Sequence, residues 1–389
     1  MNRYKRLAFR FFFKFTAFFL GIGGLWILSP DRGMVFGVES KELSANLNSG
    51  GNDRYGFNTG GGAMKEPIVS DALDQTPDLG AGWIRVLCGW HETEPAENQW
   101  NFSLSDRFLE KTRKLGLKVV LQLTLGTFFC TTEPGDLPDK SISKPPMATD
   151  EQFSDYVFHV VSRFGSRDNQ LGNGYGQNKV AYFEIGNEPD LETQWRNHPE
   201  EYARILHLAY VAVKKADPSA KVVLGGLAAG GGQSCNTNFL DQILADAQFP
   251  ANQNFDIFNY HTYARKKDQA DKYNEFRKKI GDKPFWVTET GFPADPETQR
   301  TRRPNFGYES GEAGQVSYMK DVLPELLRLG VEKVFWYTLV DQPRDNTPFC
   351  TYGLLYLPGK QGMGKEGRGL TGTLAKKKIF EAFRELAAH

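Results

Sequence analysis

Short apolar runs alternate along the chain with longer segments in which apolar residues recur every three or four positions. The clearest of these segments is 150–164, where the apolar residues share one helical face: Phe153, Tyr156, Val157, Val160, Val161 and Phe164. Another predicted helix, 106–115, is stopped by Gly116 and lies between apolar runs at 82–87 and 117–123. Strand, helix, strand is the unit from which parallel sheets are built.

The same alternation continues to the end of the chain. Strands are predicted at 54–58, 82–87, 117–123, 182–189 with its terminal turn, 221–225, 255–260, 284–288 and 331–339. Helices are predicted at about 106–115, 150–164, 199–216, 239–247, 268–280, 315–329 and 374–386. Eight strands with intervening helices predict a single α/β domain over residues 54–389, a (β/α)8 or TIM barrel.

Two of the predicted strands have a glutamate at the carboxyl end, where the apolar run gives way to a turn. One closes with Asn187-Glu188-Pro189 and the other with Thr288-Glu289-Thr290-Gly291. In a parallel barrel the carboxyl ends of all strands meet at one face, so these two carboxylates become neighbours although they are far apart in sequence. A carboxyl group partly shielded from water has a raised pKa and is suited to act as a general acid.

These strand ends resemble the signatures of the clan A retaining glycoside hydrolases. Five elements occur in the expected order: Trp83-Ile84-Arg85, Asn187-Glu188-Pro189, Asn259-Tyr260-His261-Thr262-Tyr263, Thr288-Glu289-Thr290-Gly291 and Val334-Phe335-Trp336. The resemblance covers about residues 54–389. Within the clan the pattern is similar to the family 39 group, including barrel-only exopolysaccharide endoglycosidases, and more loosely to family 5 cellulases.

Two departures limit the resemblance. The third strand ends Leu121-Gln122-Leu123-Thr124 and lacks the histidine common in family 5. The chain also ends at the helix that follows the eighth predicted strand, without the accessory β-domain of typical family 39 xylosidases. This favours an endo-acting enzyme over an exo-acting xylosidase.

The resemblance implies a retaining β-glycosidase with Glu188 as acid/base and Glu289 as nucleophile. Arg85 would keep Glu289 ionised, because a nearby positive charge lowers the pKa of an acid. The remaining implied substrate-binding residues are Asn187 for the sugar 2-hydroxyl, His261 with Tyr263 or Tyr260, Trp336 as an apolar floor, and Trp90 as a subsite residue. By strand alternation we expect Trp83 and Trp286 to face outward beneath helices.

A catalytically silent barrel that binds polysaccharide at the cell surface is the alternative. It would be favoured if either glutamate or Arg85 lay out of reach of the others. In both hypotheses the partner is a polysaccharide or oligosaccharide, and the sequence leaves the sugar and the linkage open.

The composition argues against other partners. Lys and Arg total 47 and Asp and Glu total 47, so the net charge is zero and nucleic acid is not an expected ligand. We expect no cofactor: Gly172-x-Gly174-x-Gly176 precedes a strand and lacks the dinucleotide spacing. We also expect no metal, because Cys88, Cys130, Cys235 and Cys350 lack Cys-x-x-Cys spacing; in an exported protein they could form up to two disulfides at the barrel rim.

The N-terminal segment predicts export. Basic residues between Arg3 and Lys14 precede an uncharged run from Phe15 to Leu28, as in a signal peptide. Residues 1–28 are therefore predicted to be a cleaved signal peptide or an uncleaved signal anchor, in which 7–28 would attach the protein to a membrane. A polar linker over 29–53 follows. The predicted location is periplasmic, cell-surface or extracellular.

Overall fold

The computed structural model describes residues 51–60, 64, 67–125, 149–166, 180–191, 194, 198–229, 235–303, 306–341, 351–359 and 372–389. The chain divides into two units, Met1–Ser44 and Ala45–His389, and all described residues belong to the second. The predicted export segment, most of the linker, Cys130 and Cys350 lie outside the described residues.

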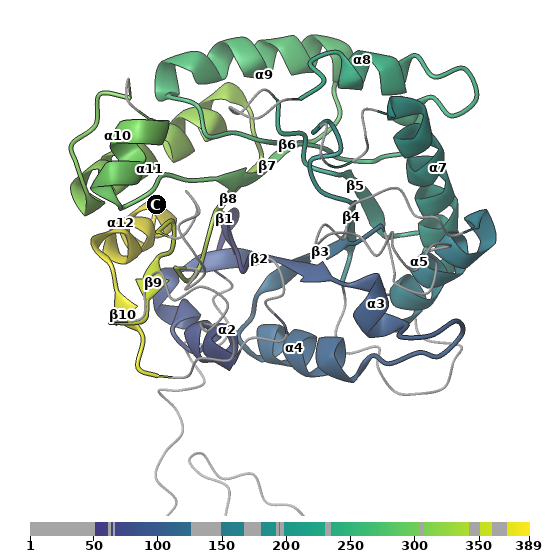
Figure 1. Cartoon of the computed structure of the whole chain (residues 1–389), viewed down its shortest axis with the longest axis horizontal. Helices are drawn as coiled ribbons and strands as arrows, with labels where there is room; N and C mark the ends of the chain where they lie inside the picture. Colours follow the sequence, from purple (N-terminus) through teal and green to yellow (C-terminus); the bar gives the residue numbers. More distant parts are fainter. Residues whose placement is uncertain are drawn as a thin grey trace, which may run out of the picture. The chain divides into compact units, whose positions relative to one another are not determined.

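Eight parallel strands form one sheet in the order β5-β4-β3-β2-β1-β8-β7-β6 (Figure 1). Isolated parallel bridges between Val223 and Ile257 and between Leu227 and Tyr260 join β5 to β6 and close the sheet on itself. The strands are β1 Asn52–Asn58, β2 Ala81–Cys88, β3 Lys118–Leu123, β4 Tyr182–Ile185, β5 Lys221–Leu224, β6 Phe258–His261, β7 Phe285–Thr290 and β8 Lys333–Trp336. The predicted TIM barrel is confirmed.

Helices surround this barrel, and every helix predicted from the sequence is present (Figure 1). They are α4 Ser103–Lys114, α5 Asp150–Phe164, α7 Pro199–Ala216, α8 Phe239–Leu244, α9 Lys266–Ile280, α11 Glu312–Leu329 and α12 Lys378–Ala387. Local signals set their ends: Thr149 and Gln152 form a capping box at the start of α5, and Gly330 ends α11 with a φ of 108°.

Several short elements were not predicted. They are α2 Pro67–Leu73, η2 Thr76–Leu79, α3 Trp90–Thr93, η4 Ala251–Gln253, α10 Pro296–Arg302, β9 Leu355–Tyr356 and β10 Ala375–Lys376. Among the described residues, no helix combines the length and apolar composition that a membrane crossing would require.

An aromatic layer fills the amino-terminal end of the barrel. The ring of Trp83 lies 5.5 Å from that of Trp286 and 5.1 Å from that of Tyr182. Trp83, Trp286 and Phe335 belong to one buried cluster, and Tyr182 packs against it. These residues come from β2, β4, β7 and β8, so they can meet only across the barrel interior. The expectation that Trp83 and Trp286 face outward is therefore wrong.

A polar layer lies directly above the aromatic one. Because side chains alternate along a strand, the residue two positions after an inward aromatic also faces inward. Arg85 follows Trp83 and Glu184 follows Tyr182; Trp83, Arg85 and Glu184 are buried, and Tyr182 is half-buried. The barrel thus places the charged groups next to buried aromatic side chains, where electrostatic interactions are stronger than in water.

Candidate active site

Glu188 and Glu289 lie together at the carboxyl ends of β4 and β7. One oxygen of each carboxylate and one ring nitrogen of His261 all lie within 4.8 Å of one another. Glu188 sits in a tight turn after β4 with a φ of 43°, and its backbone N–H donates to the Gly226 carbonyl at 2.9 Å. The barrel therefore joins the two glutamates that the sequence separates.

Asp190 fixes the turn that carries Glu188. Its carboxylate is buried and accepts hydrogen bonds from the backbone N–H groups of Ala228 (2.8 Å) and Ala229 (2.9 Å), beyond the end of β5. Burial raises the pKa of Asp190, while these two hydrogen bonds act in the opposite direction. The turn after β4 is thereby attached to the neighbouring strand end.

Arg85 is the centre of the polar layer and is 4% exposed. Its guanidinium has five N–H donors, and the structure provides an acceptor for each. Nε donates to Glu184 Oε2 (2.6 Å), Nη1 to Asn58 Oδ1 (3.1 Å) and Glu289 Oε1 (2.6 Å), and Nη2 to Glu184 Oε1 (2.8 Å) and Asn187 Oδ1 (2.8 Å). The predicted contact between Arg85 and Glu289 is present.

Glu184 is a functional residue that the sequence reading missed. It is fully buried in β4, forms a two-point contact with Arg85, and accepts further hydrogen bonds from Gly226 N–H (3.1 Å) and Asn259 Nδ2 (3.1 Å). A charge in a strand buried on both faces requires such partners. Its presence in the apolar run Tyr182–Ile185 was the signal that could have identified it.

His261, the last residue of β6, and Tyr263, two residues beyond it, bind the two catalytic candidates. His261 Nδ1 lies 3.0 Å from Glu188 Oε1 and 3.6 Å from Glu289 Oε2, and its Nε2 lies 3.2 Å from the Thr288 hydroxyl. The Tyr263 hydroxyl donates to Glu289 Oε2 at 2.8 Å. Tyr260 instead points outward to Gln269, so of the two tyrosines Tyr263 is the one in the site.

The charges in this cluster favour an ionised Glu289. Burial raises the pKa of Glu289, but the nearby charges of His261 and Arg85 and the hydrogen bond from Tyr263 more than offset it, so the net pKa lies below the ordinary value. Burial lowers the pKa of His261, and the two carboxylates raise it by more. The pKa of Arg85 is raised, because Glu184 and Glu289 outweigh burial.

Trp336 is not the floor of the site. It follows the inward-facing Phe335 by one residue, so it faces the helices, where it is fully buried, packs against Tyr318 of α11 and donates from Nε1 to the Tyr352 carbonyl at 2.9 Å. Tyr337, the next residue, is half-buried, and its ring lies 6.3 Å from that of Tyr352, which itself lies 5.9 Å from the ring of Tyr263. The aromatic residue near the site from this strand is therefore Tyr337.

Trp90 also lies away from any open surface. It is fully buried at the start of α3, stacks on Tyr156 at 4.7 Å, and donates from Nε1 to Glu94 at 2.7 Å. The unpredicted helix α3 turns its ring toward α5. In this conformation Trp90 has no exposed face with which to bind a sugar, contrary to the prediction.

The cluster of Glu188, His261 and Glu289 is also the place where a cation would be sought. Within the part of the chain that the structure describes, Glu188, His261 and Glu289 are the group whose donor atoms are close enough to share a metal ion. Arg85 donates a hydrogen bond to Glu289, and its fixed positive charge disfavours the binding of a second cation at this place. Cys88 has a free, buried thiol.

The fold and this pair of carboxylates define the class of protein, a TIM-barrel glycosidase. The chain belongs to glycosyl hydrolase family 5: the cellulase model of that family matches residues 47–319. It is therefore a glycoside hydrolase by family, and the predicted membership of clan A is confirmed.

Solved structures share the fold at low sequence identity. A family 39 glycoside hydrolase from the gut symbiont Bacteroides cellulosilyticus is 18% identical with a TM-score of 0.58, over 87% of this chain and 64% of that one. A monomeric β-xylosidase from Caulobacter crescentus is 17% identical with a TM-score of 0.61, over 87% and 68%. The family 53 catalytic domain from Ignisphaera aggregans is 16% identical with a TM-score of 0.56, over 86% and 96%.

This chain thus spans a little under two thirds of the family 39 structure. No curated protein matches its sequence. These structures establish the barrel fold and do not identify the substrate.

Proposed function

We propose that the protein cleaves β-linked polysaccharide with retention of anomeric configuration, by double displacement. The observation that carries the proposal is the proximity of Glu188 and Glu289, whose nearest oxygens lie within 4.8 Å. Retaining enzymes hold their carboxyl groups about 5–5.5 Å apart, whereas inverting enzymes keep about 6.5–9.5 Å so that water fits between. The short separation supports direct attack by a carboxylate.

In the first step Glu289 attacks the anomeric carbon while Glu188 gives its proton to the departing glycosidic oxygen. The C–O bond to the leaving sugar breaks and an ester to Glu289 forms. In the second step Glu188 removes a proton from water, which displaces Glu289 and restores both carboxyl groups. The lowered pKa of Glu289 suits the first role, because an attacking carboxylate must be ionised.

The supporting residues have matching roles. Arg85 and Tyr263 occupy the two oxygens of Glu289 and orient it. The Asn187 side-chain oxygen accepts from Arg85, which leaves its amide N–H groups as the donors available to the sugar 2-hydroxyl. Tyr337 is the aromatic side chain available to pack against a sugar face. Both glutamates and Arg85 are within contact distance, and this argues against the silent barrel.

We further propose that cleavage occurs within the polysaccharide chain. This rests on the similarity of the strand-end motifs to those of barrel-only exopolysaccharide endoglycosidases. An endo-acting enzyme lowers the viscosity of a polymer solution long before monosaccharide accumulates. Early release of monosaccharide without a fall in viscosity would contradict this part of the proposal.

The main test is cleavage of a panel of β-linked polysaccharides, with product configuration followed by NMR. Glu188→Gln and Glu289→Gln should each lose activity, the former by about 10²–10⁴-fold, the usual contribution of general acid–base catalysis. A small anion such as azide should partly rescue Glu188→Ala with a β-glycosyl azide, and Glu289→Ala with the α-glycosyl azide. Inverted products from the unmodified enzyme, or full activity of Glu289→Gln, would reject the mechanism.

Export through residues 1–28 also remains our proposal, based on the basic start and the apolar run. The N-terminal sequence of the protein recovered from its native host would distinguish cleavage from anchoring. A chain starting at Met1 in the soluble cytoplasmic fraction would reject both.

A further inference from the structure

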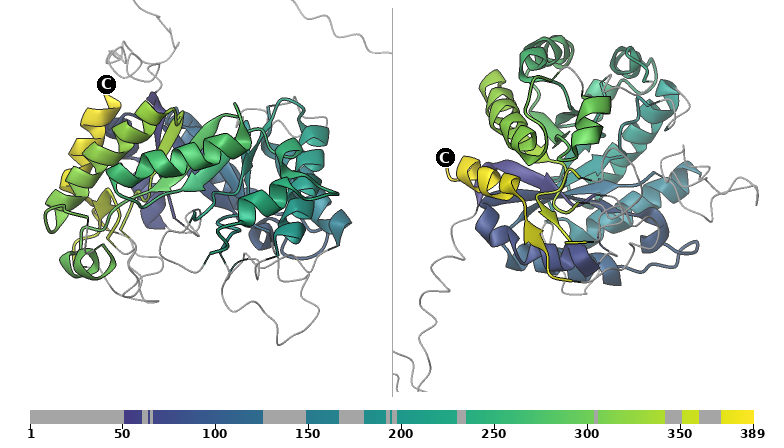
Figure 2. Two further views of the ribbon diagram at one scale, coloured as in Figure 1. Left: turned by 90° about the horizontal axis from the view of Figure 1, so that it is seen from above. Right: turned by 60° about the vertical axis from the view of Figure 1, so that its left-hand side comes forward.

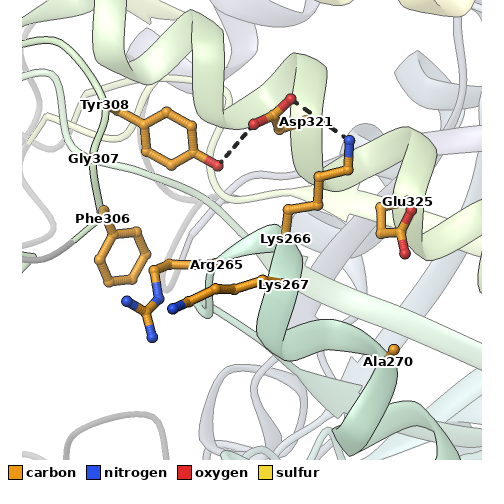
Figure 3. Close-up of a pocket in the computed structure, with 9 residues that line it drawn as sticks. All are labelled: Arg265, Lys266, Lys267, Ala270, Phe306, Gly307, Tyr308, Asp321 and Glu325. Carbon is orange, nitrogen blue, oxygen red and sulfur yellow. Dashed lines mark hydrogen bonds and ion pairs between the residues drawn. The ribbon is translucent and has the colours of Figure 1, made fainter.

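A cavity lies between the start of α9 and the middle of α11 (Figure 3). Its volume is about 630 Å³, within the range of about 300–1,000 Å³ typical of small-molecule sites. The helices α9 and α11 pack side by side on the outside of the barrel (Figure 2). The lining residues are Arg265, Lys266, Lys267, Ala270, Phe306, Gly307, Tyr308, Asp321 and Glu325.

The cavity is close to the catalytic residues in the chain and in space. Arg265 lies two residues after Tyr263, which binds the candidate nucleophile. The guanidinium of Arg303 lies over the Tyr263 ring at 5.7 Å and over the Phe306 ring at 5.5 Å. Arg303 therefore contacts both Tyr263 in the candidate site and Phe306 in the cavity lining.

The carboxylates around the cavity are already paired. Asp268 binds Arg265 (2.7 Å), Glu325 binds Arg328 (2.5 Å), and Asp321 accepts from the Tyr308 hydroxyl (3.3 Å) and lies 3.9 Å from Lys266. These contacts use all three acidic groups. Their charges offset those of Arg265, Arg328 and Lys266.

Two cations remain without a carboxylate among the described residues, Lys267 and Arg303. Lys267 is exposed, and its side chain extends toward the same open side of the cavity as that of Arg265 (Figure 3). The Nε atom of Arg303 is buried and has no hydrogen-bond acceptor in the described part of the chain. Three of the lining residues are basic and two are acidic, so the cavity carries a net positive charge in a protein whose net charge is zero.

Lys267 does not stabilise the helix on which it lies, whereas Arg265 pairs with Asp268 three residues further along the same helix. Arg265, Lys266 and Lys267 stand at the start of α9, where the helix dipole is positive and acidic residues are preferred. A local rule broken without structural benefit is a sign of function. Phe306 and Tyr308 add two aromatic rings that can contact the apolar face of a sugar.

We propose that this cavity is a carbohydrate subsite that binds a negatively charged sugar unit of the substrate chain. The anion lies beside Lys267, the lining cation without a carboxylate partner among the described residues, and the sugar ring packs on Phe306. Guanidinium and ammonium groups bind carboxylate and sulfate oxygens through charge-assisted hydrogen bonds. The inference deepens the proposed function, on which it rests, by giving the polysaccharide a chemical class: it carries acidic sugars.

The test compares two probes in the full-length protein with Glu289→Gln, so that neither probe is consumed. One is a β-linked oligosaccharide containing uronate units, and the other is the same oligosaccharide after reduction of its carboxyl groups to alcohols. Calorimetry should give at least about threefold tighter binding of the acidic probe in dilute buffer, and the preference should shrink as salt is added. A sulfated neutral oligosaccharide, as a third probe, distinguishes a carboxylate from a sulfate ester.

Lys267→Gln should remove most of this charge preference. Lys278→Gln is the matched control, because Lys278 is an exposed lysine in the last turn of the same helix. Equal binding of the acidic and reduced probes, no binding of either, or an equal effect of the two lysine changes would overturn the proposal.

The outcome is separable from that of the proposed mechanism. Charge preference is a binding property, whereas retention and the loss of activity in Glu188→Gln are properties of hydrolysis. Equal binding with retained hydrolysis would reject only the subsite, and charge preference without any hydrolysis would reject only the mechanism.

Discussion

The two glutamates of the active site are held in different ways. Both oxygens of Glu289 are bound, one by Arg85 and the other by Tyr263, and its side chain is 11% exposed. Glu188 is 19% exposed, and among the described residues its side chain is bound only by His261. A nucleophile that must remain ionised benefits from permanent donors. An acid/base group must gain and lose a proton, and a fixed cation would prevent this.

The largest expected effect comes from removing the shared cation. Arg85→Met leaves Glu184 buried without its partner, which should lower the free energy of unfolding by about 3–5 kcal/mol. The double variant Arg85→Met/Glu184→Met removes both buried charges and should recover part of that stability but no activity. Urea unfolding of the two variants and the unmodified protein measures this. Unchanged stability in Arg85→Met would mean that Glu184 does not depend on it.

Tyr263→Phe removes one donor from Glu289. Loss of a hydrogen bond to a charged group costs about 1.5–3 kcal/mol, or about 10–100-fold in kcat/KM. The hydrogen bond lowers the pKa of Glu289. Its loss should raise that pKa, so activity should disappear at a higher pH as the solution is acidified.

The pH profile of kcat/KM measures the Tyr263→Phe effect. Tyr260→Phe is the control, because Tyr260 contacts Gln269 and not Glu289. An acid limb that does not move in Tyr263→Phe would contradict the idea that permanent donors keep the nucleophile ionised.

Glu184→Gln should move the acid limb in the opposite direction. Removing the negative charge of Glu184 leaves the full charge of Arg85 acting on Glu289, whose pKa should fall. The acid limb of kcat/KM therefore shifts to lower pH. A shift in the same direction as in Tyr263→Phe would show that Glu184 acts only by holding Arg85 in place.

The smallest effect distinguishes two neighbouring aromatic residues, Trp336 at the end of β8 and Tyr337 directly after it. Tyr337→Ala should raise KM, by about tenfold if one sugar contact worth about 1.4 kcal/mol is lost, with little change in the unfolding temperature. Trp336→Phe loses its hydrogen bond to Tyr352 and should lower stability by about 1 kcal/mol while KM stays constant. Steady-state kinetics and thermal unfolding of both variants show which of the two residues contacts the sugar. The reverse pattern would restore Trp336 as the sugar platform.

The sequence was sufficient for the barrel and for much of the site because both depend on regular patterns. Parallel strands buried on two faces have continuous apolar runs, and their carboxyl ends meet at one face. This brought Glu188, Glu289 and Arg85 together before any geometry was known. The choice between Tyr260 and Tyr263 required the structure, because the strand ends between them at His261 and alternation no longer applies.

The errors in placing Trp83 and Trp336 came from applying the alternation of side chains along a strand without first fixing one residue whose orientation was known. Trp83 precedes Arg85 by two residues and must share its side, so an inward Arg85 already implied an inward Trp83. For the same reason the aromatic residue of the site was assigned to Trp336 when it is the next residue, Tyr337. Trp90 was misplaced because the short helix α3, which buries it, has no periodic signal of its own.

All five N–H bonds of Arg85 are used, and this limits how the protein can change over evolution. Lysine offers at most three donors and no planar fork, so replacing Arg85 would leave buried acceptors unmatched. Positions 58, 85, 184, 187 and 289 should therefore vary together among homologous chains or not at all. A homologue that has lost Glu184 but kept Arg85 should carry a new acceptor on an adjacent strand, and such compensating pairs can be sought directly in genomes.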